Sequence, residues 1–535
     1  ITRCIELWAK QEGLIGPDET LHRREVDIIG AGLNHQTWFV KVQWRGMDMT
    51  PRLLELFEAI SRIPRGSKNE AAIARWFEAW AAGRNYRSER DPAGNLRIAV
   101  PPAPGCERAP GVVLQGHLDM VCEKTPASPH DFTRDPIRLI RAGDWLHADR
   151  TTLGADNGAA LALGAALAED SSAARPPLEL LFTVDEETGL TGAKQLQPGF
   201  LQGRILVNLD SETEGVFTIG CAGGRDVTIR RALRREMVPG DWRVQRLTVG
   251  GLGGGHSGID IHRHRANALK LLARTLAALM AEAPLLILDL RGGTRRNAIP
   301  RDASALFASP ADRAEVLRKR AAGCEAAFRV EFAAESALAV SIAAEPLTRD
   351  RMGAVSAAEG AALIHLLLAL PHGVSQLSPD FEDGVLTSSN LAMTEMDTDR
   401  LRVITSQRSM NLSSLNAASE SVRAVGALAG GCCETESEYP PWTPDPDSAL
   451  LARCRRIYRA LYRTEPRISA IHAGLECAIV GGLYPDMEMI SFGPTIENAH
   501  SPNERLHVPS FCRLQGFLAA LLASVAGGET PGAGT

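Results

Sequence analysis

Three short apolar runs in the first half of the chain each end in histidine or acidic residues. The runs are Gly111–Gln115, Leu178–Val184 and Ile205–Leu209, and segments with helical periodicity lie between them. Short runs rich in valine, isoleucine and leucine, alternating with helices, are typical of buried strands in a largely parallel sheet. Ligands bind beyond the carboxyl ends of such strands, so we expect an α/β fold with helices flanking the sheet and one functional edge.

Apolar residues at helical spacing predict two amphipathic helices, Leu53–Ile63 and Ala71–Ala82. Ser67 and Glu70 match a capping box in front of the second helix. The run Gly158–Ala168 is apolar on every side, which predicts a buried helix.

The pattern changes near residue 226. Strands such as Arg243–Val249 are followed by a long helix, Ala266–Ala281, and no further apolar run ends in acidic residues. This change predicts a separate α+β domain inserted into the first one. We therefore expect an extraneous N-terminal segment at 1–50, a main domain formed by 51–225 and 441–535, and an inserted domain at 226–440.

Residues 1–50 do not look like the start of the domain that follows them. The stretch Ala31–Met49 resembles an internal piece of the NAD-dependent family 4 glycosidases. It has no dinucleotide-binding glycine fingerprint, so the resemblance does not imply glycosidase activity. We expect the segment to come from a gene fusion or a misdrawn start.

The overall charge is nearly balanced. The chain carries 58 lysine and arginine residues against 64 acidic residues, a formal charge of −6, and no basic block. This balance gives no electrostatic support for nucleic-acid binding. We identify no apolar run of about 18 residues and no N-terminal signal pattern, so we expect a soluble cytoplasmic protein without a membrane partner.

Asp156 lies in the small-residue turn Thr151–Gly158, where the predicted buried helix begins. A carboxylate at this position can cap backbone N–H groups, or it can point outward and hold cations. The acidic residues and the histidine at the three strand ends favour the second interpretation.

Two neighbouring cations need one bridging carboxylate and further ligands for each ion. We predict that Asp156 bridges two cations. His117 and Asp210 would complete the protein ligands of one ion, and Glu187 and His500 those of the other.

Two more acidic residues fit supporting roles. Asp119, two residues beyond His117, would accept the other imidazole N–H and fix the tautomer. Glu186 and Glu187 point in different directions if their segment is extended, so Glu186 would face the attacking water as general base.

Eight motifs, taken in order, together resemble the M20 family of metallopeptidases, most of all its aminoacyl-histidine dipeptidase branch. The resemblance covers about residues 51–525 and implies the metal ligands named above, with Asp119 and Glu186 as the catalytic pair. It also implies two zinc ions per subunit, with cobalt or manganese as alternative ions, and an inserted lid domain that forms a homodimer. The motifs are GHLDMV, TTLGADNG, TVDEETG, LDSETEG, GGHSG, RNAIPR, HAGLEC and FGPTIENAHSP.

The same resemblance suggests three substrate-binding residues in the lid. His256, between glycines, would polarise the scissile carbonyl, Arg408 would clamp the substrate carboxylate, and Asn297 is a further candidate. A plain turn histidine is the alternative for His256.

The expected function is a metallo-dipeptidase that hydrolyses Xaa-His and related unblocked dipeptides by attack of a metal-bound hydroxide. The alternatives are a related amidohydrolase that removes the acyl group from N-acyl amino acids, and a non-catalytic binding protein that kept the fold. The retained Glu186 argues against a binding protein, which has no need of a base.

Overall fold

The computed structural model describes residues 50–171, 174–346, 353–381 and 384–527. The chain divides into two compact units. The first comprises residues up to Phe217, Pro446–Ile468 and the chain from Leu483, and the second comprises Thr218–Asp445 and Ser469–Gly482. Residues 469–482 thus pack with the second unit, whereas we had assigned them to the main domain. The expected N-terminal segment lies, except for Thr50, outside the described residues.

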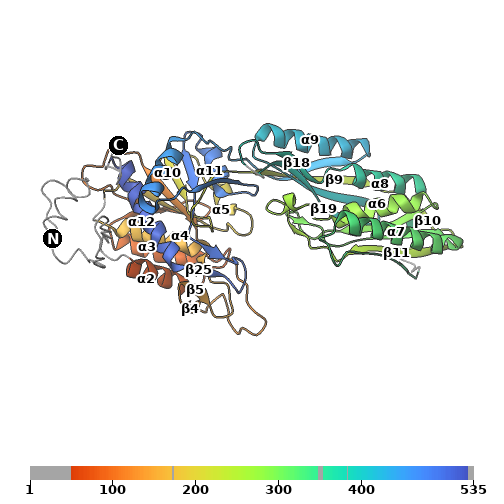
Figure 1. The fold of residues 1–535 in the computed structure, drawn as a ribbon, viewed down its shortest axis with the longest axis horizontal. Coiled ribbons are helices and arrows are strands. Elements are labelled where there is room, and N and C mark those ends of the chain that lie inside the picture. Colours follow the sequence, from red (N-terminus) through yellow and green to blue (C-terminus); the bar gives the residue numbers. More distant parts are fainter. Residues whose placement is uncertain (1–49, 172–173, 347–352, 382–383, 528–535) are drawn as a thin grey trace, which may run out of the picture. The chain divides into compact units, whose positions relative to one another are not determined.

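The first unit is built on a mixed sheet (Figure 1). Strand β3 pairs in parallel with β6 and β7, and β7 pairs in parallel with β23. Strands β1 and β2 extend the sheet antiparallel beyond β6. The expected mixed, largely parallel sheet is confirmed. In sheet order the strands are β1 (Arg87–Arg90), β2 (Leu96–Val100), β6 (Leu178–Thr183), β3 (Val112–His117), β7 (Ile205–Asn208), β23 (Glu488–Ser491), β8 (Val216–Cys221) and β22 (Arg467–Ile471). Most residues of β8 and β22 belong to the second unit.

The helices predicted at 53–63, 71–82 and 158–168 form as α2, α3 and α4. Every residue from Gly158 to Ala168 is buried, which confirms the expected buried helix. The prediction of a capping box is wrong, because Glu70 is itself the N-cap residue of α3 and its side chain makes no capping hydrogen bond. The helices are α2 (Thr50–Ser61), α3 (Ala71–Ala82), α4 (Ala155–Glu169), α5 (Thr191–Gln195), α10 (Ala449–Tyr462) and α12 (Val508–Val525), and a small sheet contains β4 (Leu139–Ala142), β5 (Trp145–Ala148), β24 (Ile496–Glu497) and β25 (Arg505–His507).

Among the described residues, one helix is long and apolar enough to cross a membrane by length and composition alone. This helix is α12, although we had identified no such run in the sequence. Buried residues make up 61% of it, and it packs against α4 and α10. A core helix passes the same test, and these contacts are those of a core helix.

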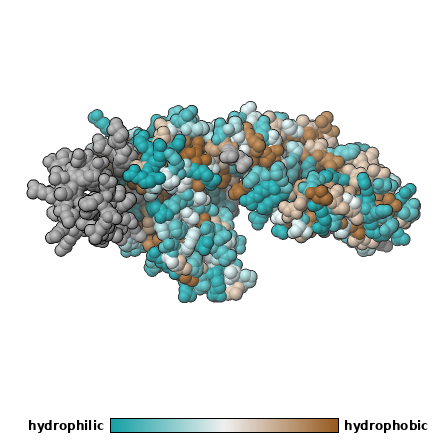
Figure 2. Space-filling view, viewed as in Figure 1, coloured by the Kyte–Doolittle hydropathy of each residue, from teal (hydrophilic) through white to brown (hydrophobic). Residues whose placement is uncertain are grey.

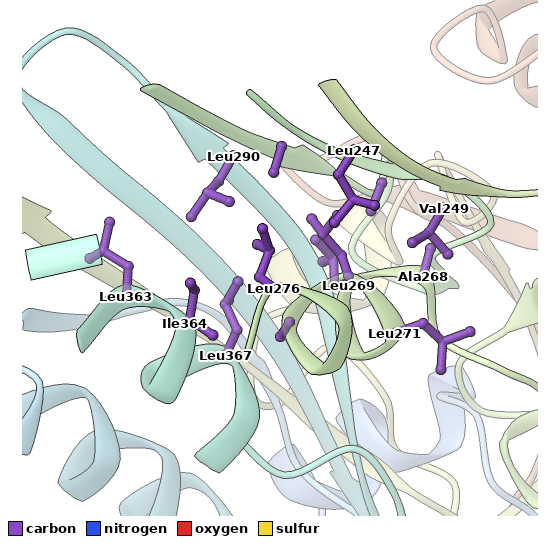
Figure 3. Close-up of a cluster of buried hydrophobic side chains, with 14 of the residues drawn as sticks. Leu247, Val249, Ala268, Leu269, Leu271, Leu276, Leu290, Leu363, Ile364 and Leu367 are labelled. Atoms are coloured by element: carbon purple, nitrogen blue, oxygen red, sulfur yellow. The ribbon is translucent and has the colours of Figure 1, made fainter. Parts of the chain in front are cut away.

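The second unit contains an antiparallel nine-stranded sheet with helices packed on it. Leucine and valine side chains from β11, α6 and α8 form its core, and Figure 3 shows Leu247, Leu269 and Leu367 within this cluster. This unit matches the expected α+β character of the inserted region. Its main elements are β9 (Gly223–Ala232), β11 (Trp242–Gly250), α6 (Ala268–Met280), β13 (Leu286–Gly292), β15 (Ala303–Pro310), α7 (Ala314–Glu331), β16 (Ala339–Ala344), α8 (Ala357–Ala369), β18 (Gly373–Leu377), β19 (Val385–Met396), β20 (Arg400–Ser409), α9 (Leu412–Leu428) and β21 (Cys432–Tyr439).

Shorter elements complete the described chain. Two-stranded sheets pair β10 with β17 and β12 with β14. On the face drawn in Figure 2, hydrophobic residues lie interspersed among hydrophilic ones. The remaining elements are β10 (Arg235–Met237), β12 (Gly255–His256), η1 (Ile261–Arg263), β14 (Ala298–Ile299), η2 (Ala311–Arg313), β17 (Gly353–Val355) and α11 (Glu476–Leu483).

Candidate metal centre

The carboxyl ends of three neighbouring strands bring the predicted ligands to one edge of the first sheet. His117 is the last residue of β3, Glu187 follows the end of β6, and Asp210 follows the end of β7. Asp156 lies in the first turn of α4, and His500 lies in the loop between β24 and β25. The structure therefore gathers, in one unit, five side chains that are far apart in sequence.

The Asp156 carboxylate lies between two histidines. Its Oδ1 is 3.0 Å from Nε2 of His117, and its Oδ2 is 3.0 Å from Nε2 of His500. The residue has non-helical backbone angles at the start of α4, where the N-cap residue is Gly154. This placement favours cation binding over helix capping for Asp156.

Two groups of donor atoms share Asp156. In one, Nε2 of His117 lies 3.3 Å from Oδ1 of Asp210; in the other, Nε2 of His500 lies 3.1 Å from Oε2 of Glu187. The donor atoms of each group lie within 4.8 Å of one another. Donors bound at about 2.0–2.2 Å to a tetrahedral ion are themselves about 3.3 Å apart. The spacing and the nitrogen and oxygen chemistry of both groups fit one divalent cation each.

The electrostatics of this cluster also fit cations. Burial opposes protonation of His117, but neighbouring carboxylates, above all that of Asp210, raise its pKa well above the usual value. Hydrogen bonds with Asp156 and Glu187 raise the pKa of His500 to about 11. Burial raises the pKa of Asp210 to about 7. Without cations, these raised pKa values favour the protonated forms of the three side chains. Cations bind the deprotonated forms, so cation binding would displace those protons.

Asp119 is fully buried beside His117 and contacts both glutamates. Its Oδ1 is 3.3 Å from Nδ1 of His117 and accepts the backbone N–H of Glu186 at 3.1 Å. Its Oδ2 accepts the hydroxyl of Ser67 at 2.8 Å and the N–H of Glu187 at 3.3 Å. One carboxylate therefore fixes the orientation of the imidazole and the position of the turn after β6.

Glu186 adjoins the first histidine. One of its carboxylate oxygens, a nitrogen of His117 and an oxygen of Glu187 lie within 4.8 Å of one another. The segment is a turn rather than extended chain, because the carbonyl of Glu186 accepts the N–H groups of Gly189 and Leu190. Our argument from an extended segment was therefore wrong, although both glutamates do reach the cluster.

The second unit contains the three residues predicted to bind substrate. Nδ1 of His256 accepts the backbone N–H groups of Gly258 and Ile259 at 3.2 and 3.1 Å. The proton of the neutral ring is therefore on Nε2. Burial and the charge of Arg408 lower the pKa of His256 to about 4, so this ring is a neutral N–H donor at physiological pH.

Asn297 and Arg408 are held beside the His256 segment in different ways. The Asn297 carbonyl accepts the N–H of Ser257, and β12 pairs with β14 next to it. Arg408 is 7% exposed, and its Nη1 donates to the hydroxyl of Tyr439 at 2.7 Å. Its buried Nε has no hydrogen-bond partner among the described residues, which suits a guanidinium that binds an anionic ligand.

The sequence analysis did not identify two buried charged residues next to the candidate metal centre. Arg65 and Glu504 are each 2% exposed and bond to the backbone around Asp156. Neither belongs to a recognisable ligand spacing, and an isolated charge in a polar loop ordinarily indicates a solvated surface. Only the tertiary structure reveals them.

Comparison with known proteins identifies the class. Residues 113–524 match the model of Peptidase family M20/M25/M40, and the chain belongs to this family. Residues 30–91 also match the family 4 glycosyl hydrolase C-terminal domain. That second match includes the N-terminal stretch singled out above and extends over α2 and α3 of the first unit.

Two dipeptidases are similar to this chain over nearly their whole length. The cytosol non-specific dipeptidase of Escherichia coli (strain K12) is 39% identical over 473 residues, which are 88% of this chain and 97% of that protein. The crystal structure of aminoacylhistidine dipeptidase from Vibrio alginolyticus is 38% identical with a TM-score of 0.79, covering 88% of this chain and 96% of that one. Aminopeptidase PepT from Bacillus cereus, 15% identical with a TM-score of 0.52 over 89% and 99% of the two chains, shares the fold.

Proposed function

We propose that this protein is a dinuclear metallo-dipeptidase that hydrolyses Xaa-His and related unblocked dipeptides. The observation that carries the proposal is the Asp156 carboxylate, with one oxygen beside His117 and the other beside His500. The similarity to two dipeptidases supports the choice of substrate class.

The proposed cations are two zinc ions, because imidazole and carboxylate donors suit zinc. When bound, they would lower the pKa of water towards about 7 and offset the charge of the carboxylates. The proposed ligands are His117 and Asp210 for one ion, Glu187 and His500 for the other, and Asp156 for both.

Two acidic residues would handle protons and orientation. The Glu186 carboxylate would take the proton of the attacking water and later pass it to the leaving amine. Asp119 would hold the Nδ1–H of His117, so that Nε2 presents its lone pair to the ligand cluster. Its bonds to the backbone of Glu186 and Glu187 would keep the base at a fixed distance from that cluster.

The second unit would supply substrate recognition. The Nε2–H of His256 is suited to donate to the developing oxyanion of the scissile carbonyl. The buried guanidinium of Arg408 would bind the substrate carboxylate, with Asn297 as a further contact. We also propose a homodimer formed through this unit and a location in the cytosol, as in the name of the E. coli relative.

The test is metal content measured together with rates on a panel of Xaa-His dipeptides and N-acetyl amino acids. Glu186→Ala should retain both cations and lose turnover by orders of magnitude. Glu58→Ala, which removes an exposed glutamate of α2, is the control and should behave as wild type. Substantial turnover in Glu186→Ala would show that the base is misassigned. Release of acetate from N-acetyl amino acids, without hydrolysis of dipeptides, would identify a deacylase. Metal binding without any turnover would identify a binding protein.

A further inference from the structure

The backbone turn that carries Asp156 is held by two buried side chains of opposite charge. Glu504 and Arg65 contact it through backbone groups rather than through the Asp156 carboxylate. The mechanism proposed above uses neither residue.

Glu504 collects three N–H groups of the turn. Its Oε2 accepts the N–H of Leu153 at 2.7 Å and of Gly154 at 2.9 Å, and its Oε1 accepts the N–H of Asp156 at 3.2 Å. Glu504 lies four residues after His500, so one loop supplies a proposed terminal ligand and the acceptor that fixes the bridging residue.

Arg65 binds carbonyl groups of the same turn and of the segment after β3. Its Nη1 donates to the carbonyls of Leu118 at 3.0 Å and Asp119 at 2.7 Å, and its Nη2 donates to the carbonyl of Gly154. A Cβ atom at Gly154 or at Gly158 would come within 2.7 Å of Nη2, so the guanidinium fits only against these glycines.

We propose that Glu504 and Arg65 are positioning residues that hold the turn at residues 153–156. They thereby place the Asp156 carboxylate between the group of His117 and Asp210 and the group of Glu187 and His500. Arg65 joins the turn to the segment that carries His117, and Glu504 joins it to the loop that carries His500. A carboxylate that must reach two ions at once tolerates little displacement, because each ion's donors are confined to a narrow range of distances. The inference rests on the proposed function, since it concerns the affinity of the same site for cations.

The test uses the full-length protein stripped of metal and titrated with Co²⁺, followed by visible absorption and by calorimetry. Glu504→Gln keeps the size of the side chain but places an NH₂ group against backbone donors. Arg65→Lys keeps the charge but removes the planar fork that reaches three carbonyls. Each variant should bind Co²⁺ about 10–100-fold more weakly than wild type, with an altered absorption spectrum that reports changed coordination.

Glu179→Gln is the matched control. Glu179 is 7% exposed, and its Oε2 accepts the N–H groups of Gln202 and Gly203, both at 2.9 Å, while Oε1 accepts from Arg97. The substitution disturbs a similar buried carboxylate, yet none of these partners is a proposed ligand. It should leave the affinity and the spectrum unchanged.

Wild-type affinity and spectrum in both Glu504→Gln and Arg65→Lys would overturn the inference, as would an equal loss in Glu179→Gln. If Glu504→Gln does not fold, the Co²⁺ affinity and spectrum of Arg65→Lys alone test the inference. A wild-type protein that binds no divalent cation would overturn the proposed function as well. A wild type that binds two ions, with variants that bind them equally well, would overturn the inference alone.

Discussion

Replacing Asp119 by asparagine probes how the candidate site is held in place. The carboxylate of Asp119 faces four donors: Nδ1–H of His117, the N–H groups of Glu186 and Glu187, and the hydroxyl of Ser67. An amide has only one acceptor oxygen, so its NH₂ group must face two of these donors. The hydroxyl of Ser67 can rotate and accept a hydrogen bond from the NH₂ group. The NH₂ group therefore costs less free energy at the Oδ2 position than at the Oδ1 position. The N–H of Glu187 then meets another donor.

The magnitude follows from these contacts. The variant loses one hydrogen bond to a charged acceptor, which is worth about 1.5–3 kcal/mol. If this bond is needed to keep Glu186 in its reactive position, at about 1.4 kcal/mol per factor of ten its loss lowers kcat by up to about 10–150-fold. The missing negative charge beside His117 also weakens the basicity of that imidazole, so cation affinity should fall in the same direction.

The assay is kcat for an Xaa-His dipeptide at saturating substrate and metal, with metal content measured on the same samples. Asp91→Asn is the control. Asp91 is 8% exposed and accepts the N–H groups of Gly94 and Asn95, and its hydrogen-bond partners in the described structure include none of the proposed ligands. A kcat for Asp119→Asn within threefold of wild type, at equal metal content, would refute the reasoning.

Three further predictions follow from other contacts. Gly116→Ala should destabilise the protein by about 2 kcal/mol or more, because its Cβ would lie 2.3 Å from Oδ1 of Asn157; an unchanged midpoint in urea unfolding would contradict this. His500→Ala should bind one cation instead of two, and two cations per chain by elemental analysis would show that His500 is not a ligand. Burial and the charge of Lys270 lower the pKa of His372 to about 4, below the value of about 6.5 in the unfolded chain, so acid favours unfolding between these pH values. His372→Gln should reduce that pH slope of the unfolding free energy by up to about 1.4 kcal/mol per pH unit, and an unchanged slope would exclude His372 as its source.

The edge of the sheet was predictable from sequence because it depends on local pattern. Apolar runs that end in His117 or in acidic residues indicate buried strands, and the carboxyl ends of parallel strands meet at one edge whatever the loops do. Asp156 and His500 lie outside those strands, so the rule alone does not pair them: Asp156 was predicted from the small-residue turn where α4 begins, and its position between His117 and His500 depends on tertiary geometry.

Other features depend on tertiary geometry that no local pattern encodes. Ser67 and Glu70 match a capping box in sequence, but the hydroxyl of Ser67 donates to Asp119, and Glu70 accepts the N–H groups of Lys68 and Asp185. Competition from distant partners overrides the local preference. The residues at 469–482 gave no compositional signal that they pack with the second unit.

The long separation between Asp210 and His500 has a consequence for biosynthesis. Under the proposed assignment, the group that contains His117 and Asp210 can assemble early, from strands synthesised in the first half of the chain. The other group stays incomplete until the ribosome has released the loop of His500 and the Glu504 that follows it. Under this assignment, a nascent chain could hold one ion before the inserted region is synthesised, but the group for the second ion would be complete only after the loop of His500 has left the ribosome.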